Sequence, residues 1–248
     1  MKLLALLLII CSLSAFAQEN TGIQKDKLKG RVKSVIDQEY MMRRKSGIKR
    51  LKSDNRIVYS YDMNGNETEA RCFGKNMEPD YLLQLKYDAK DKLTESILHY
   101  SDSISDTRSH FKYDERGNQV EEDEYNAHDS LVNKHIFHYD EKGNQVEFLT
   151  YNANNGLAYK SINKFDSAGN KIREEYYGAK DSLEFKLEFR YDSQGREIEQ
   201  DYYTPQNVLS FQLTYKYEDF DNLGNWLKET IYENDKIESI DKRDITYY

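Results

Sequence analysis

Residues 183–203 decide the fold of this chain, and they read LEFKLEFRYDSQGREIEQDYY. From Leu183 to Tyr191, apolar or aromatic side chains alternate with charged ones. A period of two is typical of a β-strand with one buried face and one solvated face. A turn from Asp192 to Arg196 and a second strand up to Tyr203 follow, so the stretch predicts a β-hairpin.

The same unit recurs every 26 residues. A first aromatic series shows the period, at Tyr61, Tyr87, Tyr113, Tyr139, Phe165, Tyr191 and Tyr217. A second aromatic series accompanies it, at Phe73, His99, Tyr125, Tyr151, Tyr177, Tyr203 and, after a three-residue insertion, Tyr232. Such self-similarity indicates a repeat architecture, in which each unit covers the apolar face of its neighbour.

Most first strands end in a turn of the form Asp-x-x-Gly-Asn, with Arg196 replacing Asn in one copy. Aspartate at the first position can bond the backbone that follows it, and glycine accepts a positive φ. We assign a structural role to the turn residues Asp114, Gly117, Asp140, Gly143, Asp166, Gly169, Asp192 and Gly195. The apolar residue after the turn usually comes one place later than Leu93 does in its repeat. The pairing register therefore stays open, with a β-bulge at the glycine as one solution.

The turn spacing predicts about seven hairpins over residues 57–233. Residues 18–56 form a basic segment that contains one more strand, and residues 234–248 form a C-terminal strand. So long a meander must twist until its aromatic face covers itself. We predict an all-β, antiparallel β-hairpin repeat meander that forms a curled sheet, an open barrel or a short β-spiral. Both aromatic series are expected inside the curl, because burial of rings is the main source of stability available.

Residues 1–17 have the form of a Sec signal peptide, with Lys2, a short apolar run and a small-x-small cleavage site. The run is too short to span a bilayer, and no other stretch is long or apolar enough. Ile10 stands where a lipobox has a small residue, so we expect cleavage rather than lipidation at Cys11. The sequence predicts export to the periplasm, the cell surface or the exterior.

The net charge of −8 is unevenly distributed. Residues 18–56 hold twelve Lys/Arg against five Asp/Glu, whereas residues 57–248 hold 23 against 39. Two solvated faces of opposite sign explain this asymmetry. An acidic chain argues against a nucleic-acid partner, which requires a basic footprint.

The recurrent turn resembles the YD repeat of the RHS family. It reads Tyr113-Asp-Glu-Arg-Gly-Asn118, Tyr139-Asp-Glu-Lys-Gly-Asn144 and Tyr191-Asp-Ser-Gln-Gly-Arg196. In large members of that family, the resemblance implies, such repeats coil into a β-sheet shell around a toxin or other cargo. This chain is too short for such a shell and has no toxin-like region. It looks more like the small secreted YD-repeat proteins of bacterial envelopes, for which the resemblance implies no settled activity.

No residue pattern indicates a catalytic or metal centre. The five histidines are interpreted as structural, and acidic runs such as 121–124 recur with the repeat, as an outer solvated face would. Paired carboxylates also serve glycosidases, but a catalytic pair is needed only once. Asp62, Asn64 and Asn66 faintly resemble a calcium loop, and the hairpin turn explains them as well. We expect no metal and no cofactor.

These observations favour a secreted or periplasmic, non-enzymatic scaffold that binds protein or assembles with itself through sheet edges and loop rows. The first alternative is a glycan-binding module that stacks sugars on an exposed tyrosine row. For that row we select Tyr125, Tyr151, Tyr177 and Tyr203. The lesser alternative is an envelope enzyme such as a glycosidase, for which the irregular positions Arg71, His99 and Trp226 are candidates. The expected partners are protein or a cell-surface glycan, without nucleic acid and without a transmembrane segment.

Overall fold

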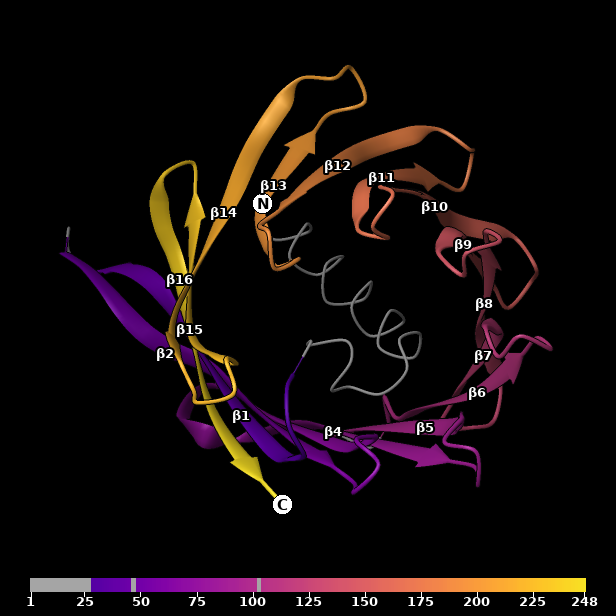
Figure 1. Cartoon of the computed structure of the whole chain (residues 1–248). Helices are drawn as coiled ribbons and strands as arrows, with labels where there is room; N and C mark the ends of the chain where they lie inside the picture. Colours follow the sequence, from indigo (N-terminus) through magenta and orange to yellow (C-terminus); the bar gives the residue numbers. More distant parts are fainter. Residues whose placement is uncertain (1–27, 46–47, 102–103) are drawn as a thin grey trace.

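Sixteen antiparallel strands form the wall of a closed barrel (Figure 1). The structure is a computed structural model that describes residues 28–45, 48–101 and 104–248; the predicted signal peptide lies outside these ranges. Each strand pairs with the strands before and after it in sequence. The strands are β1 (Val32–Lys45), β2 (Ile48–Tyr61), β3 (Glu67–Phe73), β4 (Pro79–Tyr87), β5 (Leu93–Tyr100), β6 (Thr107–Tyr113), β7 (Gln119–Asn126), β8 (Leu131–Tyr139), β9 (Gln145–Asn152), β10 (Leu157–Phe165), β11 (Lys171–Gly178), β12 (Leu183–Tyr191), β13 (Glu197–Tyr203), β14 (Leu209–Phe220), β15 (Trp226–Glu233) and β16 (Lys236–Tyr247). A 3-10 turn, η1 (Lys75–Met77), precedes β4.

Strands β1 and β16 close the barrel, and they lie side by side in Figure 1. Their ladder runs from the pair Val32 and Tyr247 to the pair Met41 and Ser239. The prediction of an all-β antiparallel fold is confirmed, and of the predicted shapes the barrel is the one that forms, although it is closed rather than open. Closure pairs the backbone groups that an open edge would leave to solvent. The predicted self-assembly through sheet edges therefore has no free edge at β1 or β16.

The Asp-Gly turns share one hydrogen-bond pattern. In the turn between β6 and β7, the Gly117 N–H donates to the Asp114 carbonyl at 3.1 Å, and Gly117 has a φ of +93°. The Asp114 side chain accepts from both the backbone N–H and the side-chain amide of Asn118, at 2.8 and 2.9 Å. The same pattern recurs at Asp140 and Asp166. These bonds hold the hairpin closed, because they satisfy backbone groups that the turn takes out of the ladder.

A β-bulge directly after the turn fixes the register. Lys164 pairs with Arg173 and Phe165 pairs with Lys171, so Ile172 is the extra residue. Ile172 and Ile198, which occupies the same position in β13, are 40% and 38% exposed. The bulge thus removes the apolar residue from the buried stripe. It places polar residues opposite the first aromatic series instead: Gln119, Gln145, Lys171 and Glu197.

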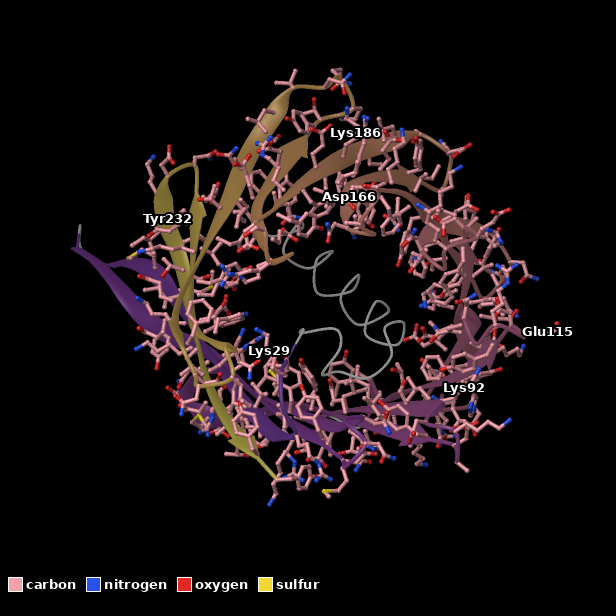
Figure 2. All side chains as sticks on the ribbon, in the orientation of Figure 1. Lys29, Lys92, Glu115, Asp166, Lys186 and Tyr232 are labelled. Carbon is pink, nitrogen blue, oxygen red and sulfur yellow. The ribbon has the colours of Figure 1, made fainter. Side chains whose placement is uncertain are left out.

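The wall has an inward and an outward face, and alternation along each strand assigns residues to them. One cavity is lined by residues of the seven consecutive strands β4–β10. Only the concave side of the wall can bring residues from so many strands around one cavity, so these residues face inward. The inward face includes Leu83 and Leu98 of that cavity. Across the barrel it includes stacked ring pairs, Tyr176 on Phe185 and Tyr202 on Phe211, with centroids 4.3 and 4.0 Å apart. Figure 2 shows that side chains project from both faces.

Candidate functional site

The first aromatic series lies on the inward face, and the hydroxyl groups of five of its members each join one hairpin to the previous one. The Tyr113 hydroxyl donates to the Leu93 carbonyl at 2.8 Å, across 20 residues of sequence. Burial is the main cause that raises the pKa of Tyr113 to about 12, so the hydroxyl stays protonated and can donate. The same bond recurs from Tyr87 to Glu67, Tyr139 to Gln119, Tyr191 to Lys171 and Tyr217 to Glu197.

Phe165 is the member of this series without a hydroxyl, and a neighbouring side chain replaces the missing bond. The side-chain amide of Asn163, two residues earlier on the inward face, donates to the Gln145 carbonyl at 3.0 Å. This carbonyl lies 20 residues before position 165, so a tyrosine there would reach it as the other tyrosines of the series reach theirs. Asn163 therefore interrupts the apolar stripe because it satisfies a buried backbone acceptor.

The second aromatic series lies on the outward face, so the expectation that both series are buried in the lumen is wrong. Tyr125, Tyr151, Tyr177 and Tyr203 are half-buried. Lys160 lies over the ring of Tyr177 at 5.1 Å, and Lys186 over the ring of Tyr203 at 5.5 Å. These lysines cover the surface on which a sugar would have to stack.

Ion pairs between neighbouring strands also lie on the outward face. Glu121 pairs with Lys112 and with Lys134, the latter at 2.9 Å. Partial burial opposes ionisation, but the two lysines lower the pKa of Glu121 to about 2. Similar pairs join Arg190 to Asp201 at 3.0 Å, and Lys228 to Glu218 at 3.0 Å. The outward face therefore presents fixed charges of both signs.

The inward face of β4–β10 lines a cavity of about 610 Å³. Its first side, from β4 to β6, is mainly apolar. It includes Leu83, Leu85, Leu98 and Phe111, with the hydroxyl side chains of Ser96, Thr107 and Ser109 between them. Three residues of this side and its surroundings, Ala70, Leu83 and Leu98, form one buried cluster. A cavity of this size with an apolar wall suits a small organic molecule.

The second side of the cavity, from β7 to β9, is polar. His135 is buried, stacks on Phe148 with ring centroids 5.5 Å apart, and shares a hydrogen bond with the Thr150 hydroxyl at 2.9 Å. Its other ring nitrogen lies 3.9 Å from a carboxylate oxygen of Glu124. The Asn133 amide donates to that carboxylate at 2.7 Å. Burial disfavours the charge, yet His135 and Asn133 lower the pKa of Glu124, so Glu124 is an anion in the cavity wall.

Glu122 is the residue of this polar side whose bonding is incomplete. It is 6% exposed, and in the sheet it stands opposite Phe111 of β6 and His135 of β8. Among the described residues, its Oε2 atom has no hydrogen-bond partner. Burial raises the pKa of Glu122 to about 7, while His135 and Ser109 oppose that shift. An unpaired carboxyl oxygen in a cavity wall is a place where a ligand can bind.

A second group of inward charges lies on β1, β15 and β16, and there a cation is already present. Arg243 lies 3.2 Å from the Asp37 carboxylate and 3.7 Å from the ring centroid of Trp226. Burial, and then the nearby Asp37, raises the pKa of Asp241 to about 8. Arg243 therefore already supplies a cation to this group of charges, whereas the polar side of the cavity contains neither lysine nor arginine among the residues that line it.

Glu122 and Glu124 are candidate site residues that no motif in the sequence singles out. The expectation that residues 121–124 form an outer solvated face is wrong for two of the four. Glu121 and Asp123 face outward, where they pair with Lys134, whereas Glu122 and Glu124 face the cavity. Strand alternation requires two faces for any four consecutive residues, and this was the signal available in the sequence.

The other predicted candidates do not gather into a site. Arg71 pairs with Glu69 and His99 with Asp106, while Trp226 lies below Arg243. None of the three lines the cavity. Within the described part of the chain, no three His, Cys, Asp or Glu side chains are grouped as a metal site. In the faint calcium motif, Asp62 accepts from the backbone N–H groups of Asn64 and Asn66 at 2.8 and 2.9 Å, so the turn uses this carboxylate.

The chain matches no protein-family model and no curated protein in sequence. Among solved structures it is similar to a porin-like protein from Bacteroides uniformis, with a TM-score of 0.60 and 10% identity over 87% of this chain and 96% of that one. A porin-like protein from Bacteroides vulgatus gives a TM-score of 0.49 and 12% identity, with coverages of 88% and 99%. A putative outer membrane lipoprotein-sorting protein domain from Vibrio parahaemolyticus gives 0.30 and 11%, with coverages of 90% and 89%. The first likeness supports the barrel fold, and fold alone does not define function.

Proposed function

We propose that this protein is a non-enzymatic barrel of the bacterial cell envelope that binds a small, largely apolar molecule in its lumen. The observation that carries the proposal is the cavity of about 610 Å³, with an apolar side on β4–β6 and a polar side on β7–β9. Ligand sites generally combine apolar walls with a few placed polar groups. The envelope location rests on the predicted signal peptide, and the YD-repeat resemblance stays a prediction.

The outward face supports a barrel whose wall is surrounded by water. Strands that face lipid carry a band of apolar side chains. Here the outward positions of several strands carry ion pairs, such as Lys134 with Glu121 and Lys228 with Glu218. Charges of both signs in this arrangement are suited to solvent. In the described residues, no helix has the length and apolar character needed to cross a bilayer.

Glycan binding on the outward tyrosines remains the alternative proposal. Four tyrosines at equal spacing on one face support it, whereas the lysines over Tyr177 and Tyr203 argue against open stacking surfaces. A glycan array separates the two proposals. Binding that is lost in Tyr151→Ala and Tyr177→Ala, with folding retained, would favour the glycan module over the lumenal site.

The lumenal proposal is tested by titrating the full chain with decan-1-ol in a calorimeter. Leu98 is buried in the cavity wall, so Leu98→Trp is expected to fill the cavity and weaken binding by at least about tenfold, or about 1.4 kcal/mol. The matched control is Ile97→Trp, on the same strand but facing away from the cavity. Equal affinity in both variants, or no binding by the unmodified protein, would reject the proposal.

A further inference from the structure

We propose that the lumenal ligand is an amphiphile with a cationic amine head group, which the Glu122 and Glu124 carboxyl groups receive. This inference rests on the proposed function and adds the chemical class of the ligand. Three features of the cavity support it: its balance of charges, the open oxygen of Glu122, and the position of the apolar side.

The first feature is the charge of the lining. Two carboxyl groups and one histidine face the cavity, and the described residues that line it include neither lysine nor arginine. His135 is the nearest cation candidate, and it already stands beside Glu124 and bonds Thr150. A buried carboxylate requires a partner of opposite charge. An anionic head group would meet two carboxyl groups with no side-chain ammonium or guanidinium to offset them.

The second feature is the open acceptor. Glu122 is more than nine-tenths buried, and its Oε2 atom has no hydrogen-bond partner among the described residues. A carboxylate accepts hydrogen bonds, and a primary ammonium donates three. Bonds between an ammonium and a carboxylate are among the stronger hydrogen bonds in proteins. A ligand amine would therefore complete the bonding of Glu122 and stand next to Glu124.

The third feature is the apolar side of the cavity, against which the hydrocarbon part of the ligand would pack. Leu83, Leu85 and Leu98 lie on β4 and β5, and Phe111 lies on β6, between them and the carboxyl groups. Phe111 pairs directly with Glu122 across the two strands. A head group at Glu122 would thus lead its hydrocarbon part across Phe111 toward the leucines, where burial of methylene groups is favourable.

The test compares three ligands of equal chain length at pH 8: decylamine, decan-1-ol and sodium decyl sulfate. Below the micelle concentrations of the amine and the sulfate and below the solubility limit of the alcohol, calorimetry on the full chain is expected to show the amine binding at least about tenfold more tightly than the alcohol, and the sulfate most weakly. Glu122→Gln keeps the shape of the side chain and is expected to remove the advantage of the amine while leaving the affinity for the alcohol. Glu124→Gln is a second variant with the same expected direction.

Glu121→Gln is the matched control, because Glu121 is adjacent in sequence and faces outward. It removes the same charge from the protein, so unchanged preference for the amine in this variant excludes attraction by overall charge. Equal affinities for amine and alcohol, or a preference that survives both Glu122→Gln and Glu124→Gln, would overturn the inference while the lumenal proposal stands. If none of the three ligands binds, or if Leu98→Trp leaves alcohol binding intact, the lumenal proposal itself fails.

Discussion

Tyr113 and Tyr125 belong to the same repeat, yet the two faces of the wall use them differently. On the inward face, the Tyr113 hydroxyl bonds the Leu93 backbone and holds two hairpins together. On the outward face, Tyr125 packs its ring against His110 at 5.7 Å. Carboxylates show the same contrast, since burial raises the pKa of Glu122 whereas lysines lower that of Glu121. The residue type recurs with the repeat, but its energetic role depends on the face to which it belongs.

We expect the largest difference in the free energy of unfolding between the two faces when a whole aromatic ring is removed. Tyr61 is 3% exposed and packs with Leu28, Val32 and Val35 near the closure of the barrel. Tyr61→Ala should lower the free energy of unfolding by about 3–5 kcal/mol, because it removes a buried ring and leaves a cavity. Tyr177→Ala, on the outward face, should cost about 1 kcal/mol or less. Urea unfolding followed by Trp226 fluorescence measures both, and equal losses would contradict the contrast.

The second difference is the direction in which two adjacent glutamates, Glu122 and Glu121, make the free energy of unfolding depend on pH. Glu122 has a pKa of about 7 in the fold against an ordinary value of 4.5, so the folded state holds a proton that the unfolded chain releases. Its contribution to stability is present below pH 4.5 and is lost as the pH rises to 7, by an amount on the order of 3 kcal/mol. The free energy of unfolding of Glu122→Gln, relative to that of the unmodified protein, should therefore rise as the pH increases from 4 to 8.

Glu121 should behave in the opposite way. Its pKa of about 2 means that its ion pairs stabilise the fold above pH 4.5 and that this contribution is lost as the pH falls toward 2. Because solvent screens a partly exposed pair, Glu121→Gln should lose only about 1 kcal/mol at pH 7. Unfolding curves at several pH values that show the same sign for both variants would contradict the assignment of faces.

A third expected effect concerns the inward hydrogen bond that Asn163 supplies beside Phe165. Asn163→Ala leaves the Gln145 carbonyl without this donor and should lower the free energy of unfolding by about 1–3 kcal/mol. The double variant Asn163→Ala with Phe165→Tyr should recover most of the loss, because the new hydroxyl can reach the same carbonyl. A double-mutant cycle measures the coupling. Simple additivity would show that the two positions do not share this acceptor.

The smallest expected effect comes from single hydroxyl groups. Tyr113→Phe removes the bond to the Leu93 carbonyl and should cost about 1 kcal/mol. Tyr151→Phe, at the equivalent outward position of the next repeat, should change the free energy of unfolding by less than about 0.5 kcal/mol. Chemical denaturation resolves this pair, and a larger loss at Tyr151 would place a structural bond on the outward face.

The local elements follow from the sequence alone, because they depend on neighbours in the chain. Alternation from Leu183 to Tyr191 specifies a strand, and Asp192 with Gly195 specifies the turn after it. The period of 26 residues then specifies antiparallel hairpins of equal size. None of these features requires a contact between distant parts of the chain.

Which side of those hairpins faces the lumen depends on contacts between distant parts of the chain. Closure brings β1 against β16, some 200 residues away, and a bulge after most of the Asp-Gly turns reverses the alternation, as at Ile172. Both events change which residues face inward, and neither follows from the spacing of residues alone. The cavity depends on seven strands curving together, so Glu122 became a candidate ligand contact only when the wall around it was complete.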